Sequence, residues 1–165
     1  MTRGTRLLLA SVLGMTLGTN PHVIAQEGAS HPGMDEIKAD RASVEEERRK
    51  IVAAGLNFTA EEHQKFWPMY QEYRAAMGKV TDKGMKIIFS YADAYRAGSL
   101  EDAKAKMLLE EYASFDTTRV QTREAYMKKF MGILPASKVF RYFQIENKLD
   151  AIVTMGLAQQ VPLAK

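Results

Sequence analysis

The chain has 165 residues, no cysteine and a formal net charge of +3 at pH 7. Without cysteine it has no disulfide, no thiolate chemistry and no lipid anchor through Cys. Removal of Arg3 and Arg6 with the leader described next leaves a charge of +1, which gives no general reason to expect a nucleic-acid partner.

Residues 1–25 have the pattern of a secretory signal peptide. Two arginines precede an apolar stretch, residues 7–17, and the small residue Ala25 ends the segment. The apolar stretch is shorter than the roughly 20 residues that span a bilayer, and no other segment reaches that length. We therefore expect cleavage after Ala25 and an exported, periplasmic protein.

The rest of the chain predicts one all-α domain. No strand-like alternation bounded by turn residues occurs between the glycines and prolines. We expect a disordered lead-in at 26–34, a helical domain at 35–157 and a flexible tail at 158–165. The predicted architecture is an elongated four-helix fold, in which a long antiparallel hairpin is joined by a short N-terminal helix and a C-terminal helix.

The first helix is predicted from about Asp35 to Ala54, with Gly55 as its C-cap. Opposite charges stand four residues apart within it, and this spacing is typical of a solvated helix face. The two pairs are Glu45 with Arg49 and Glu46 with Lys50.

Thr59 and Glu62 predict a capping box at the start of the second helix. Apolar residues then recur at alternating steps of four and three, which predicts a seam that packs against another helix with a left-handed supercoil. Pro68 lies off this seam and should kink the helix. The seam comprises Phe66, Tyr70, Tyr73, Met77, Val80, Gly84, Ile87, Tyr91 and Ala94.

Gly98 predicts a left-handed cap, and Ser99 with Asp102 predicts a second capping box, so the third helix should fold straight back on the second. It is expected from Leu100 to about Met131. Its seam carries Leu108, Tyr112, Phe115, Tyr126 and Phe130, and also two polar residues, Arg119 and Thr122.

Pro135 is predicted to be the first residue of the fourth helix, where its missing N–H has no cost. One apolar stripe should face the other helices through Val139, Phe143, Leu149, Ile152 and Val153. Two middle helices several times the usual length predict an elongated molecule with too few helices to cover both sides of the hairpin.

His63 is the only histidine inside the predicted fold, and no second ligand stands at a metal-binding spacing. Its position relative to Phe58 is that of a hydrophobic staple, which is the favoured interpretation over a weak metal ligand. The neighbouring rings are expected in the core, except Trp67, which lies beside the seam and is a candidate surface contact.

No nucleophile beside a base is apparent, so neither an enzyme nor a cofactor is expected. Methionines adapt to many partners, and together with basic residues along the hairpin they predict a mixed apolar and basic binding face. The candidate client-binding residues are Trp67, Met69, Arg74, Met85, Lys86, Arg119 and Met127.

Two helix starts carry a family resemblance. Residues 56–62, L-N-F-T-A-E-E, open the long helix, and residues 133–138, I-L-P-A-S-K, open the last one. With the export signal and the helix order, the chain resembles the LTXXQ-motif periplasmic family, the Spy and CpxP group. Here Glu62 stands in place of the motif glutamine in the first copy, and Pro135 and Lys138 replace Thr and Gln in the second.

The resemblance implies a cradle-shaped homodimer and an ATP-independent chaperone or stress-signalling role. It also implies capping by Thr59 and Glu62, in agreement with the residue pattern. Metal-sensing relatives use clustered histidines that this chain lacks. The leading hypothesis is therefore a periplasmic protein that holds unfolded or membrane-derived clients. The alternative is a regulatory partner of a membrane sensor, with or without metal sensing.

Overall fold

The computed structural model describes residues 34–159 and 161–164. The predicted leader and residues 26–33 of the predicted lead-in lie outside this part of the chain. The described residues form four helices and no strand, which confirms the all-α prediction. The helices are α1 (Met34–Gly55), α2 (Ala60–Arg96), α3 (Asp102–Met131) and α4 (Ala136–Ala158).

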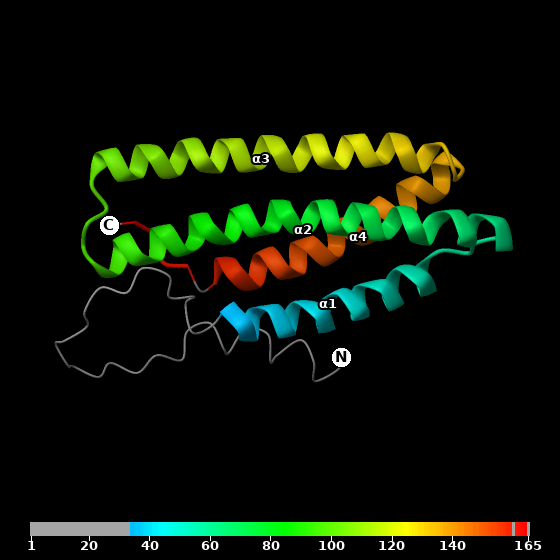
Figure 1. Cartoon of the computed structure of the whole chain (residues 1–165), viewed down its shortest axis with the longest axis horizontal. Helices are drawn as coiled ribbons and strands as arrows, with labels where there is room; N and C mark the ends of the chain where they lie inside the picture. The colour runs from blue at the N-terminus through cyan, green and yellow to red at the C-terminus, as the bar shows by residue number, and fades with distance from the viewer. Residues whose placement is uncertain (1–33, 160, 165) are drawn as a thin grey trace.

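The two longest helices, α2 and α3, lie side by side as the predicted antiparallel hairpin (Figure 1). At 1.5 Å per residue they are about 55 Å and about 45 Å long. The fourth helix, α4, begins beside the end of α3 and runs toward α1. Within the described residues, no helix combines the length and the apolar character needed to cross a membrane.

The capping box at the start of α2 is confirmed. The Thr59 hydroxyl accepts from the Glu62 backbone N–H at 3.2 Å, and the Glu62 carboxylate accepts from the Thr59 N–H at 2.7 Å. The same carboxylate accepts a hydrogen bond from Lys138 Nζ at 2.5 Å. Since Lys138 lies in the first turn of α4, this ion pair joins the two motif segments.

Gly98 has a φ of 63°, the left-handed conformation predicted for the end of α2. The Ser99 N–H reaches the Ala94 carbonyl at 2.9 Å, and the Gly98 N–H reaches the Tyr95 carbonyl at 3.2 Å, a Schellman motif. The second capping box predicted at Ser99 and Asp102 is wrong. The backbone of Ser99 still ends α2, so Glu101 becomes the N-cap of α3, without a side-chain cap.

Two other helix ends differ from prediction by one residue. Pro135 is the N-cap of α4 rather than its first residue, and its carbonyl accepts from the backbone N–H of Lys138 and of Val139. Gly55 is the last residue of α1 rather than its cap. A Cβ on Gly55 would lie 2.5 Å from a methyl carbon of Ile145, so glycine permits the close approach of α1 to α4.

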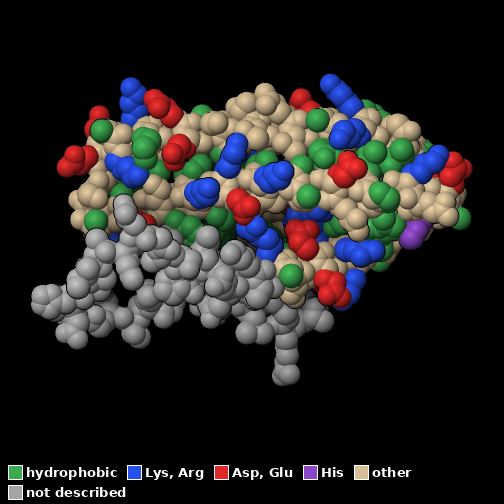
Figure 2. Space-filling view, viewed as in Figure 1, with side chains coloured by type: hydrophobic (Ala, Val, Ile, Leu, Met, Phe, Trp, Pro, Cys, Tyr) green, Lys and Arg blue, Asp and Glu red, His purple; other side chains and the backbone are tan. Residues whose placement is uncertain are grey.

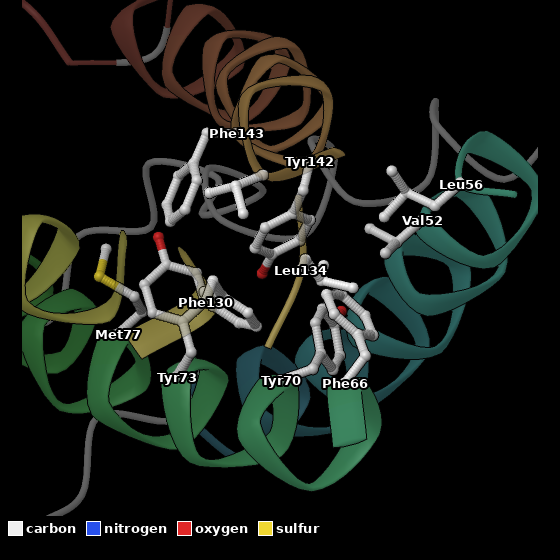
Figure 3. Packing of buried hydrophobic residues seen from close by; sticks show 11 residues of the cluster. Val52, Leu56, Phe66, Tyr70, Tyr73, Met77, Phe130, Leu134, Tyr142 and Phe143 are labelled. Atoms are coloured by element: carbon white, nitrogen blue, oxygen red, sulfur yellow. The ribbon is translucent and has the colours of Figure 1, made fainter. Parts of the chain in front are cut away.

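The core is concentrated where α2 begins and α3 ends (Figure 3). Six of the nine predicted seam residues of α2 are buried, and Gly84 packs against the ring of Phe115. All four helices or their links contribute to the main cluster. Its buried members are Val52, Leu56, Phe66, Tyr70, Tyr73, Met77, Phe130, Leu134, Val139, Tyr142 and Phe143.

Two parts of the predicted seams are exposed. On α3, Tyr112 is 53% exposed, and on α4 the C-terminal end of the stripe, Ile152 and Val153, is about half exposed at 51% and 45%. Tyr112 precedes Arg123 by three turns on the same face, and Arg123 reaches α4. Because α4 diverges from α3 toward α1 (Figure 1), none of the four described helices covers the earlier turns of that face.

The helix α4 includes Ala158, the first residue of the predicted tail. The Tyr91 hydroxyl donates to the Pro162 carbonyl at 2.8 Å, which fastens the described residues 161–164 to α2.

A chain of alternating charges connects all four helices. Its centre is Glu146, which has no exposed surface and accepts hydrogen bonds from Arg48 at 2.7 Å and Arg74 at 3.0 Å. Arg48 also bonds Asp150 at 2.9 Å. In order, the residues of this ion chain are Glu45 of α1, Arg74 of α2, Glu146 of α4, Arg48 of α1, Asp150 of α4 and Arg123 of α3.

This ion chain corrects one of the two charge pairs predicted within α1. Glu45 bonds Arg74 of α2 instead of Arg49, whose guanidinium lies 4.9 Å from the centre of the Trp67 ring. The other pair, Glu46 with Lys50, is confirmed at 3.0 Å. The α1 face that carries Glu45 is therefore an interface rather than a solvated surface.

Replacing Glu146 with alanine should destabilise the fold severely. Arg48, which is buried, and Arg74, which is partly buried, would lose the carboxylate between them, and breaking a buried ion pair in this way costs about 3–5 kcal/mol. Urea unfolding followed by far-UV circular dichroism measures the loss. Glu124→Ala, at an exposed site on α3, should stay within about 0.5 kcal/mol of wild type. Equal unfolding free energies for the two variants would contradict this role of Glu146.

The Glu62 bridge should give a pH-dependent contribution. The hydrogen bond from Lys138, followed by that from the Thr59 backbone, holds the pKa of Glu62 below its ordinary value of 4.5. Its stabilisation is therefore present above that value and is lost as the pH falls through the lower folded-state pKa. The difference in urea midpoint between wild type and Glu62→Gln should be largest near neutral pH and should shrink as the pH falls below the ordinary glutamate pKa. A difference that stays constant over this range would contradict the assignment.

Candidate binding groove

Two hollows lie between α2 and α3, with volumes of about 560 Å³ and 440 Å³, and both are lined by Lys83. We call them together the α2–α3 groove. The first is lined by Glu72, Ala75, Ala76, Lys79, Val80, Lys83, Thr118, Thr122 and Tyr126. The second is lined by Lys83, Lys86, Ile87, Glu110, Glu111, Ser114 and Phe115.

The groove lies on the side of α2 away from α1 and α4. Arg74 contacts both of those helices through Glu45 and Glu146. Lys83 follows Arg74 by nine residues, about two and a half helical turns, so it points from the opposite side of α2. The packing of α1 and α4 therefore leaves this side of the hairpin open.

Small side chains create the first hollow. Ala75 and Ala76 of α2, beside the seam, and Thr118 and Thr122 of α3 line it with short side chains. Both threonine hydroxyls donate to carbonyls of their own helix, at 2.8 Å and 2.7 Å. Their donors are thus satisfied, and the polar interruption predicted at Thr122 coincides with the gap in packing.

The groove has one basic rim along its length and an acidic stretch opposite. Lys79, Lys83 and Lys86 of α2 are exposed and form no ion pair within the described part of the chain. On α3, Glu110 and Glu111 line the second hollow. Figure 2 shows Lys and Arg side chains grouped over the line between α2 and α3.

The seven predicted client-binding residues are not brought together. Lys86 lines the groove, whereas Arg74 is 15% exposed and belongs to the ion chain, which removes it from the candidate surface. Arg119 is 46% exposed but pairs with Asp116 at 3.0 Å one turn away on α3.

The apolar candidates are half-buried. Met69 and Met127 pack against the core cluster, and Met85 is half-buried on α2. Trp67 contacts the rings of Phe66 and Tyr70 with centroid distances of 5.2 Å and 5.3 Å. Trp67, Met69 and Met127 therefore belong largely to the packing of the helices.

Lys79 and Lys83 belong to the basic residues along the hairpin but are not among the seven predicted client-binding residues. The signal that distinguishes them is their spacing, since Lys79, Lys83 and Lys86 follow one another at four and three residues. This spacing puts them on a single rim, next to the small residues that open the seam.

His63 is exposed, and its ring centre lies 6.3 Å from that of Phe58 with the rings nearly perpendicular, as in the predicted staple. Among the described residues, no group of three or more His, Asp or Glu side chains has an arrangement that holds a metal ion.

In comparisons with protein-family models, curated proteins and solved structures, none matched the chain. The resemblance to the LTXXQ-motif family therefore rests on the residues that open α2 and α4 and on the predicted export.

Filling the first hollow should not destabilise the fold. Thr122→Leu removes a hydroxyl that bonds only its own helix and adds apolar volume toward an open groove, so the unfolding free energy should change by less than about 1 kcal/mol. Phe130→Ala, at a site with no exposed surface, should cost about 3–5 kcal/mol. Urea unfolding compares the two. A loss at Thr122→Leu as large as that at Phe130→Ala would show that the hollow does not exist in solution.

Proposed function

We propose that this protein is an ATP-independent, chaperone-like binding protein that holds partly unfolded clients along the open face of the α2–α3 hairpin. The observation that carries the proposal is the α2–α3 groove. It combines unpaired lysines with an apolar floor on the side of α2 opposite α1 and α4. No catalytic step is part of this proposal.

Charge and apolar surface have separate roles in such binding. The lysines of the rim attract acidic segments of a client and speed the encounter, while apolar contacts below them retain it. Further apolar surface is available along α3, where large side chains remain exposed outside the core. Met107 lies on the side of α3 that lines the groove, whereas Leu109 and Val120, nine residues from Thr118 and Glu111, point away from it.

The alternative function, a regulatory partner of a membrane sensor, is favoured by one feature. Across the groove, the basic rim of α2 stands opposite an acidic stretch of α3 at Glu110 and Glu111. Such a pattern suits a single complementary partner better than a broad range of clients. If this protein suppresses the aggregation of several unrelated clients, the holding function is supported. If it suppresses the aggregation of none, the regulatory partner of a membrane sensor is the better proposal.

Export to the periplasm and assembly as a homodimer are parts of the proposal that rest on residues 1–25 and on the family resemblance.

The holding function predicts that aggregation of a chemically denatured client slows when the purified protein is present in equimolar amount. Light scattering measures the effect. Lys83→Glu/Lys86→Glu should abolish most of the suppression, because it replaces two cations of the rim with anions next to Glu110 and Glu111.

The matched control is Lys50→Glu/Lys148→Glu, which makes the same change in net charge at exposed sites on α1 and α4. It should suppress aggregation as the wild type does. Scattering that rises with wild-type protein as fast as in buffer would refute the holding function. Equal loss in both variants would show that net charge, rather than the groove, is responsible.

A further inference from the structure

We propose that the α2–α3 groove binds an amphipathic α-helix whose acidic edge faces α2 and whose opposite edge carries a basic residue toward Glu110 and Glu111. This inference rests on the proposed function and deepens it, because it states the conformation and the charge pattern of the bound segment. The bound helix would pack as a third helix against the hairpin, in the helix-in-groove mode of recognition.

The lysine spacing favours a helix over an extended strand. Lys79, Lys83 and Lys86 are separated by four and three residues, which spans about 10 Å along the axis of α2. Carboxylates at the same intervals on a roughly parallel or antiparallel helix rise by the same amount and meet all three lysines. Residues on one side of a strand repeat about every 6.8 Å, so three of them span about 13.5 Å and fall out of register.

The length and the floor of the groove suit a helix of about four turns. Its α2 lining extends from Glu72 to Ile87, which corresponds to about 22 Å of helix axis. Ala75 and Ala76 leave room for a neighbouring helix to approach in the first hollow. In the second hollow, Ile87 and Phe115 offer larger apolar contacts for the stripe of the bound helix.

The charges also give the bound helix a direction. Lysines line the α2 rim over both hollows, whereas Glu110 and Glu111 line only the second hollow. Glu72, in the first hollow, lies 3.9 Å from Lys129 of α3 and is already paired. The bound helix therefore needs acids along one whole edge and a base on its other edge at one end only.

The test uses fluorescein-labelled synthetic peptides and the purified protein, with binding measured by fluorescence anisotropy. The first peptide is an 18-residue helix former with a leucine stripe, acids along one edge and a terminal base on the other. The second exchanges acids and bases between these positions. The third has the sequence of the first except for proline substitutions that prevent a helix.

The first peptide should bind at least about tenfold more tightly than the second or the third, and its helical circular dichroism should increase on binding. Lys83→Glu/Lys86→Glu should weaken binding of the first peptide by a similar factor and should strengthen binding of the second. Lys50→Glu/Lys148→Glu should leave both affinities unchanged. Far-UV circular dichroism of each variant checks that it is folded.

Equal binding of all three peptides, or preference for the third, would overturn the inference. If aggregation suppression nevertheless depends on Lys83 and Lys86, the proposed holding function stands and clients bind in extended form. If the groove variant instead changes the molecular mass measured by light scattering while no peptide binds, the groove is occupied by a second copy and the inference is wrong.

Discussion

The ion chain through Glu146 determines which side of the hairpin is open. Glu146 is wholly buried, and removing a carboxylate from water has an effective cost of several kcal/mol unless its partners are well placed. Arg48 of α1 and Arg74 of α2 both reach one of its oxygens, so the charge is compensated only when three helices meet in this arrangement. The packing of α1 and α4 on that side of α2 leaves the groove on the other.

The ion chain and the rim of the groove also use different cations. The three cations of the ion chain are arginines, whereas the three on the groove rim are lysines. A guanidinium is weakly hydrated and bonds two carboxylates at fixed angles, which suits a buried position between charged helices. An ammonium on a flexible stem keeps its hydration at a surface, so it remains available to a partner. The buried ion chain therefore uses arginine, and the exposed rim of the groove uses lysine.

The sequence predicts those features of the structure that depend on residues close together in the chain. The capping box at Thr59, the left-handed Gly98 and the α2 seam follow from spacing within one or two turns. The role of Arg74 does not, because Glu146 lies 72 residues further along the chain. Likewise, the exposure of Tyr112 depends on the direction in which α4 leaves α3. The groove itself is a property of two helices in register, although its small residues and its lysines are visible in the sequence.

The distribution of packing along the hairpin gives the groove a further property. The buried aromatic cluster stands where α2 begins and α3 ends, whereas beyond Val80 the buried residues of the hairpin are only Ala94 and Leu108 among the described positions. Segments with few buried apolar contacts open locally at a lower free energy than the global fold. The second hollow lies in this half, which has few buried residues among the described positions. A partner that adds apolar contacts at Ile87 and Phe115 would supply packing that the hairpin lacks by itself, which makes that half the energetically favoured place for binding.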